Sequence, residues 1–197
     1  MSILCGVANN DAPYTVKLSE NVPQPCGKIK RVQTWICPYY AKWRDMVSRC
    51  YSKGTHTYEG CSVCESWLTF SNFRAWMVEQ EWKGLHLDKD ILFEGNKIYS
   101  PSCCSFVTQA INSFFTDSLA TRGTLMIGVT SYSGKKVCYV ARCNNPFNRS
   151  SSNYLGVFDT ELEAHLSWKN QKHKYAIKLA EDIIDPLIKE ALTRRWL

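Results

Sequence analysis

The chain has 197 residues, of which 45% are hydrophobic and 13% aromatic, and its formal net charge at pH 7 is +6. This length and apolar content predict a globular fold with a buried core, in one large domain or two small ones. The modest positive charge is compatible with a polyanionic partner but does not require one. No run of about 18 apolar residues is present, which argues against a membrane span.

The N-terminus and the cysteines bear on the cellular compartment. The opening residues, MSILCGVANNDAPY, lack the basic start and the apolar core of a signal peptide. We therefore expect an intracellular protein, located in the cytoplasm. In a reducing cytosol the ten cysteines indicate buried thiols or metal ligands rather than disulfides.

The first part of the chain predicts an irregular arm followed by two helices. Residues 1–34 are rich in Pro and Asn and show weak periodicity, which is typical of irregular structure. Residues 39–50 and 65–80 each place apolar side chains on one helical stripe, and a Cys-x-x-Cys motif lies between the two segments. The stripe residues, which we expect in the core, are Trp43, Met46, Val47, Cys50, Trp67, Phe70 and Met77.

The segment LDKDILFEGNKIYSPSCC, from Leu87 to Cys104, combines an Asp-x-Asp pair with a Gly-Asn turn. The Gly-Asn dipeptide favours a β-hairpin. In an extended strand Asp88 and Asp90 would point to one face, together with His86, and Lys89 to the other. A third helix is expected over residues 106–117.

A shift in composition near residues 120–123 predicts a second domain. Three β-like runs follow, at 125–132, 136–143 and 153–158, with SGKK as the turn between the first two. Thr160 and Glu163 match a capping box, which opens a helix to about residue 181, and a last amphipathic segment closes the chain. We expect an α+β protein with domains at 1–120 and 121–197, the second a three-stranded antiparallel sheet packed on a helix.

The second domain resembles the APETALA/ethylene-response-factor DNA-binding domain, which also occurs in phage homing endonucleases. The resemblance rests on IGVT, GKKVCYVARC, YLGVFDTELEAHLSW and KHK, within residues 121–178. It implies that the sheet lies in the major groove of double-stranded DNA with the helix behind it. Because side chains alternate across a strand, Tyr139, Ala141 and Cys143 would pack on the helix. The candidate DNA-binding residues are Thr130, Tyr132, Lys135, Lys136, Arg142, Asn144 and Tyr154, of which Arg and Asn suit guanine and adenine edges.

The first domain resembles the HNH-type phage endonucleases, a ββα-metal fold, that carry this same DNA-binding domain. The matching strings are CPYYAKWRDMVSRCY, YEGCSVCESWLTFSNFRAWM, LDKDILFEGNKIYSPSCCSFV and IN, so the two resemblances together span residues 6–178. The family implies one divalent metal, Mg²⁺ or Mn²⁺, which polarises the phosphodiester while a His activates water. Asp88 stands at the metal-binding carboxylate, but Lys89 occupies the His position and Cys103 the Asn position.

The remaining candidates for catalysis lie beside Asp88. A lysine of ordinary pKa is a poor base at neutral pH, whereas His86 could form a metal and base cluster with Asp88 and Asp90. His86 as a plain surface residue is the alternative. Asn96 is most simply the turn residue of a hairpin, although it could also reach a metal.

Cysteines supply a second candidate metal site. Cys61 and Cys64 have knuckle spacing, and the family also tends to place Cys at positions 50 and 104. The set Cys50, Cys61, Cys64 and Cys104 could hold a structural zinc (Zn²⁺), with Cys37 and Cys103 as substitutes. Buried free thiols are the alternative.

Two functions from different classes remain open on the sequence. The first is a metal-dependent HNH homing endonuclease targeted by its C-terminal sheet. The second is a DNA-binding regulator or accessory protein whose nuclease domain is degenerate. The residues at positions 89 and 103 separate these hypotheses. A zinc-stabilised interaction module without a nucleic-acid role is disfavoured by the C-terminal strings.

Overall fold

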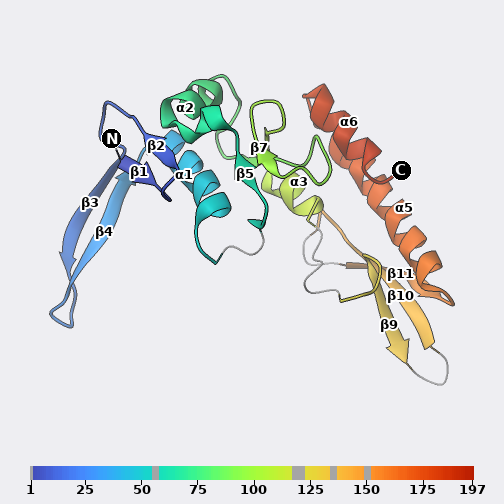
Figure 1. Cartoon of the computed structure of the whole chain (residues 1–197). Helices are drawn as coiled ribbons and strands as arrows, with labels where there is room; N and C mark the ends of the chain where they lie inside the picture. The colour runs from blue at the N-terminus through green and yellow to red at the C-terminus, as the bar shows by residue number, and fades with distance from the viewer. Residues whose placement is uncertain (1, 55–57, 117–122, 134–136, 149–151) are drawn as a thin grey trace. The chain divides into compact units, whose positions relative to one another are not determined.

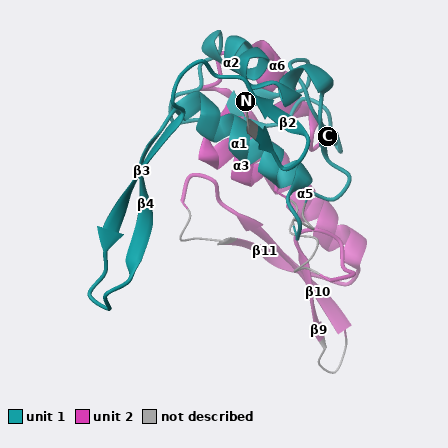
Figure 2. Cartoon of the chain, turned by 60° about the vertical axis from the view of Figure 1, so that its left-hand side comes forward, with its two compact units in different colours: residues 1–106 teal, residues 107–197 magenta. Residues whose placement is uncertain are grey.

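The computed structural model describes residues 2–54, 58–116, 123–133, 137–148 and 152–197. These residues form two compact units, 1–106 and 107–197, which are coloured separately in Figure 2. Both units combine helices with small sheets, so the α+β class is confirmed. In the described ranges no helix has both the length and the apolar character needed to cross a bilayer.

Unit 1 is built from short strands around two helices. In chain order its elements are β1 Ser2–Leu4, β2 Ala8–Asn10, β3 Lys17–Pro23, β4 Ile29–Ile36, α1 Pro38–Tyr51, β5 Ser62–Val63, the 3₁₀ helix η2 Glu65–Leu68, α2 Phe70–Val78, β6 His86–Asp88, β7 Ile98–Tyr99 and β8 Ser105–Val107. The two helices predicted at 39–50 and 65–80 are found, the second divided into η2 and α2.

The expectation of an irregular arm over residues 1–34 is wrong. β1 pairs with β2, and β3 pairs with β4 in a second antiparallel hairpin that extends away from the rest of its unit (Figure 1). Both faces of this second hairpin are largely exposed. Its strands therefore lack the alternation of apolar and polar residues by which a strand with one buried face is predicted from sequence.

The core of unit 1 is aromatic. Trp43, Trp67, Phe70 and Phe73 are almost fully buried, and the rings of Trp43 and Phe70 lie 5.5 Å apart. The indole N–H of Trp43 donates to the carbonyl of Trp67 at 2.7 Å, which satisfies a buried polar group between α1 and η2. The predicted stripes therefore supply core residues, as expected.

The segment from Leu87 to Cys104 is not a hairpin, contrary to the expectation. β6 pairs with β8, whereas β7 pairs in parallel with β5, at Ser62↔Ile98 and Val63↔Tyr99. The residues between β6 and β7 form no ladder with each other. Gly95, at φ +72°, provides the turn that the Gly-Asn dipeptide indicated, but within a loop.

Unit 2 contains the predicted three-stranded sheet and its helix. Its elements are α3 Gln109–Phe114, β9 Val129–Ser133, β10 Val137–Asn144, β11 Ser152–Phe158, α5 Glu161–Ala180 and α6 Pro186–Arg194. The strands are antiparallel in the order β11-β10-β9. The capping box is present: the Thr160 hydroxyl accepts from the Glu163 N–H while the Glu163 carboxylate accepts from the Thr160 N–H.

One face of the sheet packs on α5. Ala141 and Cys143 are fully buried, and Val129 and Ala164 complete the small core, with Tyr139 packed beside it. The predicted inward set on β10 is thus confirmed. A bulge between Ala141 and Arg142 shifts the register with β11.

Gly128 allows the sheet to approach α5 closely. Its φ is +82°, and a Cβ placed there would lie 2.0 Å from Cγ of Trp168. Trp168 is itself buried. Only glycine readily adopts this backbone conformation and also has no side chain to clash with Trp168.

The boundary between the units falls after Phe106, earlier than the residue 120 suggested by composition. α3 belongs to unit 2 because its C-terminal end packs with the helices that follow the sheet. The Phe114 ring lies 6.0 Å from that of Trp196, and the buried Lys172 ammonium donates to the Phe114 carbonyl at 2.7 Å.

Candidate nucleic-acid interface and metal site

The outward face of β9-β10-β11 collects the described residues that were predicted to bind DNA. On β10 the outward positions are Arg142 and Asn144, and both are exposed. The register carries this face to the neighbouring strands, because Arg142 lies opposite Tyr154 and Val140 opposite Thr130. Residues that lie opposite each other in a sheet share a face. Thr130, Tyr132 and Tyr154 therefore lie on the same side as Arg142 and Asn144.

Arg142 is oriented by an aromatic neighbour. Its guanidinium carbon lies 5.6 Å from the centroid of the Tyr154 ring, a cation–π contact across two strands. Tyr132 and Tyr154 are 67% and 57% exposed, so both side chains are accessible to a partner. Lys135 and Lys136, the other two predicted residues, lie outside the described residues.

The outward face also carries residues that were not among the predicted DNA-binding residues. Val157 lies opposite Val140, and Cys138 lies opposite Tyr132. Val157 is 53% exposed. Alternation along β10 also places Cys138 on this face. It does not place Val157, because strict alternation from Tyr154 would turn Val157 inward, and the register shift between Ala141 and Arg142 brings it outward.

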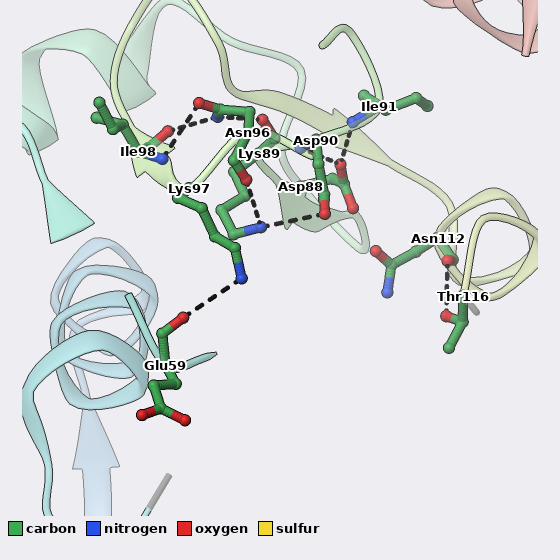
Figure 3. Close-up of polar contacts among 10 residues, drawn as sticks. All are labelled: Glu59, Asp88, Lys89, Asp90, Ile91, Asn96, Lys97, Ile98, Asn112 and Thr116. Atoms are coloured by element: carbon green, nitrogen blue, oxygen red, sulfur yellow. Dashed lines mark hydrogen bonds and ion pairs between the residues drawn. The ribbon is translucent and has the colours of Figure 1, made fainter. Parts of the chain in front are cut away.

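Asp88 closes a tight turn at the end of β6. Its Oδ1 accepts hydrogen bonds from the backbone N–H groups of Asp90 and Ile91, at 3.0 and 2.7 Å (Figure 3). Aspartate commonly stops a strand in this way, because its short side chain replaces a ladder partner. The strand therefore ends at Asp88, and the extended alternation assumed for Lys89 and Asp90 does not hold.

Lys89 points into the loop rather than away from Asp90. Its ammonium donates to Asp90 Oδ2 at 3.1 Å and to the carbonyl of Asn96 at 2.9 Å, and the residue is only 8% exposed. The Asn96 amide returns the contact by donating to the Lys89 carbonyl. Figure 3 shows these side chains directed toward one another. The expected separation of Lys89 from the Asp90 face is wrong, because the chain bends after Asp88.

Asn96 organises the other end of the same loop. Its side-chain N–H groups donate to the carbonyls of Lys89 and Ile98, and its Oδ1 accepts from the Ile98 N–H. The Asn96 side-chain amide therefore closes the loop with hydrogen bonds to the backbone, whereas a hairpin would be closed by hydrogen bonds between the backbone groups of its two strands. Asn96 is thus a structural residue of this loop and not the turn residue of a hairpin, as which it was predicted.

The Asp88 and Asp90 carboxyls form the acidic part of the candidate metal site. Burial raises the pKa of Asp88, and repulsion by Asp90 raises it further, while the backbone N–H groups of Ile91 and Asp90 act in the opposite direction. A divalent cation beside two adjacent carboxylates would offset this repulsion. Mg²⁺ is commonly held by one or two carboxylates together with water and phosphate, so Asp88 and Asp90 are the residues that would hold such an ion.

His86, on β6, is half-buried, and within the described ranges no hydrogen bond or ion pair engages its imidazole. Cys103, at the position where the HNH pattern has Asn, is half-buried and lies near the Ser102 hydroxyl, with Sγ and Oγ 3.6 Å apart. Among the described residues, no group of three or more His, Cys, Asp or Glu side chains is arranged to hold a metal ion.

All ten cysteines are free thiols. Cys61 and Cys104 are buried, Cys50 and Cys64 half-buried. Burial raises the pKa of Cys50 to about 11, with a further contribution from Cys61. It raises the pKa of Cys104 to about 12, with further contributions from Cys103, Asp88 and Cys64. The zinc set stays a prediction, and so does the substitute Cys37, a buried thiol near the Tyr14 hydroxyl.

Comparisons with models of protein families, with curated proteins and with solved structures found no match to this chain.

Proposed function

We propose that the chain binds double-stranded DNA through the outward face of the β9-β10-β11 sheet. The observation that carries the proposal is the division of side chains across β10. Ala141 and Cys143 are buried against α5, while Arg142 and Asn144 are exposed on the opposite side. Arg and Asn form paired hydrogen bonds with guanine and adenine edges in the major groove.

The surroundings of Arg142 support base reading rather than diffuse charge attraction. The cation–π contact with Tyr154 restricts the guanidinium, which lowers the entropy lost when it bonds to a base. The neighbouring Thr130 adds a hydroxyl that can bond to phosphate or base. The net charge of +6 favours association with a polyanion in general.

The experiment begins with duplexes selected by the full chain from a random-sequence pool. Affinity for a selected duplex is then measured by fluorescence anisotropy for the wild type, Arg142→Ala and Lys174→Ala. Lys174 is exposed on α5, which makes its removal a matched loss of charge away from the sheet face. Arg142→Ala should cost about 1–3 kcal/mol of binding free energy, and Lys174→Ala much less. Equal effects of the two substitutions would contradict the proposal.

A second candidate function is divalent-metal-dependent cleavage of that DNA, in keeping with the resemblance to HNH endonucleases. The observation that favours it is the pair of adjacent carboxyls with a raised Asp88 pKa. Asp88 and Asp90 would hold Mg²⁺ or Mn²⁺, which would polarise the phosphodiester and offset charge on the leaving oxygen. His86 is our choice of base, because the Lys89 ammonium is already donating to two acceptors.

Nicking of supercoiled plasmid with and without Mn²⁺ tests this second candidate. Asp88→Ala and His86→Ala should abolish nicking and leave DNA binding unchanged. Glu81→Ala, which removes an exposed carboxylate before β6, is the control and should nick normally. Plasmid that stays supercoiled with the wild type in either metal would favour the accessory DNA-binding protein. Nicking lost only in Lys89→Ala would overturn the choice of base.

A further inference from the structure

The β3-β4 hairpin, residues 17–36, is a two-stranded ribbon that projects from unit 1 (Figure 2). It is held at its base, where the buried Cys37 donates its N–H to the carbonyl of the buried Val16 at 2.8 Å. At its tip the Gln24 N–H donates to the Lys28 carbonyl at 2.8 Å, which closes the turn. An isolated two-stranded hairpin has little stability of its own, so an exposed one calls for a functional explanation.

The ribbon has a strongly positive charge for its length. Residues 17–36 contain four basic side chains and one acidic side chain, so the ribbon carries +3 of the chain's net +6. Three of the four basic residues lie in the turn or in the first half of β4: Lys28, Lys30 and Arg31. This concentration at the projecting end favours a polyanionic partner.

One face of the ribbon presents side chains that can hydrogen-bond to bases. The register places Asn21 opposite Arg31 and Ser19 opposite Gln33, and opposite residues share a face. Asn21, Arg31 and Gln33 are exposed. Arg suits guanine, and Asn and Gln suit adenine. Consecutive pairs on one face are about 7 Å apart, which corresponds to about two base-pair steps in duplex DNA.

The other face of the ribbon is mainly apolar but also carries Glu20, which lies opposite Val32. It includes Leu18, Val22, Val32 and Trp35, which are between 37% and 52% exposed. Lys30 lies on this face, opposite Val22. Lys30 and Arg31 are therefore adjacent cations that point to opposite sides, which gives the chain its own matched control.

From these observations we infer that the β3-β4 ribbon is a second DNA-reading element, which inserts its Asn21–Arg31 face into the major groove of a duplex. The major groove of B-form DNA admits a two-stranded β-ribbon. The bulge between Leu18 and Ser19 adds to the twist of the ribbon, which helps it to follow a groove. The inference rests on the proposed function, because it assigns the same class of partner to another part of the chain.

The test selects duplexes from a random pool with four full-length proteins: wild type, Arg31→Ala, Lys30→Ala and Arg142→Ala. The wild type should enrich two groups of base positions. Arg31→Ala should lose preference in one group and bind the wild-type duplex about tenfold more weakly. Arg142→Ala should lose the other group. Lys30→Ala should keep both groups and lose less than about threefold in affinity.

The outcomes separate this inference from the proposed function. If Arg31→Ala keeps the wild-type base preferences while Arg142→Ala relaxes them, the inference about the ribbon is overturned and the sheet remains the interface. If Arg31→Ala relaxes the base preferences while Arg142→Ala keeps them, the ribbon is supported as a DNA-reading element and the proposal for the sheet is overturned. Equal effects of Lys30→Ala and Arg31→Ala would contradict face-specific reading. If Trp35→Ser converts a dimer to a monomer in sedimentation while Arg31→Ala leaves base preference intact, the ribbon joins copies of the chain instead.

Discussion

The β9-β10-β11 sheet and the Leu87–Cys104 loop use polar side chains in opposite ways. In the sheet the backbone groups pair with each other, so Arg142 and Asn144 remain exposed. In the loop no ladder joins the residues between β6 and β7, and Asp88, Lys89 and Asn96 bond to loop backbone groups instead. A polar side chain in a sequence motif is thus available to a partner only where the backbone is already satisfied.

The largest effect is expected from a substitution that disrupts the packing of the sheet on α5. Gly128→Ala places a Cβ 2.0 Å from Trp168 at a φ of +82°, so unit 2 should lose about 3–5 kcal/mol of unfolding free energy. Gly123→Ala is the control, since its φ is +71° but nothing lies within 4 Å of the added atom, and it should cost only about 1–2 kcal/mol. Urea unfolding followed by tryptophan fluorescence compares the two. Similar losses would show that the Trp168 contact is not tight.

In the loop, the side chain expected to matter most for stability is Lys89. Lys89→Ala removes the donor to the Asn96 carbonyl and to Asp90, and it should cost about 2 kcal/mol of unfolding free energy. Asp90 is partly exposed, so the carbonyl contact accounts for most of the loss. Lys97→Ala removes a single exposed bond to the Glu59 carbonyl and should change stability by less than about 0.5 kcal/mol. Urea midpoints of these two variants measure the difference, and equal midpoints would contradict the assigned role of Lys89.

The second buried lysine, Lys172, supports the helices behind the sheet, and no carboxylate among the described residues pairs with it. Burial lowers its pKa to about 8, while the ammonium lies 3.7 Å from the centroid of the Phe114 ring. Between this pKa and the unfolded value near 10.4, the unfolded chain holds more protons, so the Lys172 contribution to stability rises with pH.

The prediction compares unfolding free energies of the wild type and Lys172→Met. From pH 7 to pH 9.5 the difference should shift in favour of the wild type by about 2 kcal/mol. Burial raises the pKa of the neighbouring Cys143 thiol to about 11, which acts in the opposite direction, but Cys143 is present in both proteins. A difference that stays constant over this range would mean that Lys172 keeps an ordinary pKa in the fold.

A smaller effect is expected at Asp88. Because its folded pKa is raised, the ionised carboxylate destabilises the fold above that pKa, and the penalty is absent below the unfolded value of about 4. Asp88→Asn keeps an oxygen that can accept from Asp90 and Ile91. At pH 7 the melting temperature of the variant should therefore equal or exceed that of the wild type. Near pH 3, where the Asp88 carboxyl is protonated, the variant should have no such advantage. Added Mn²⁺ should raise the melting temperature of the wild type alone.

Regular elements of this fold were predictable, and irregular ones were not. The β10 alternation identified Ala141 and Cys143 as inward residues, because one face of that strand is buried. The β3-β4 ribbon was missed since both of its faces are exposed and no buried period marks it. Residues 120–123 mark a change in composition, but the boundary after Phe106 depends on packing of Phe114 with Trp196, which is a long-range contact.

The candidate site divides in the same way. The outward positions of Thr130, Tyr132, Arg142, Asn144 and Tyr154 follow from strand periodicity. The orientation of Lys89 does not, because Asp88 ends the strand by accepting two backbone hydrogen bonds. Such turns depend on a single side chain, and periodicity over neighbouring residues does not detect them.

The central claim is that DNA lies on the outward face of the sheet, and an NMR titration of the full chain with a selected duplex tests it most directly. The largest shifts within β9, β10 and β11 should fall on Thr130, Tyr132, Arg142, Asn144 and Tyr154, including the side-chain amide of Asn144. Inward residues such as Ala141 and exposed α5 residues such as Lys174 should shift little. Binding that perturbs α5 while the five outward residues keep their free shifts would contradict the account.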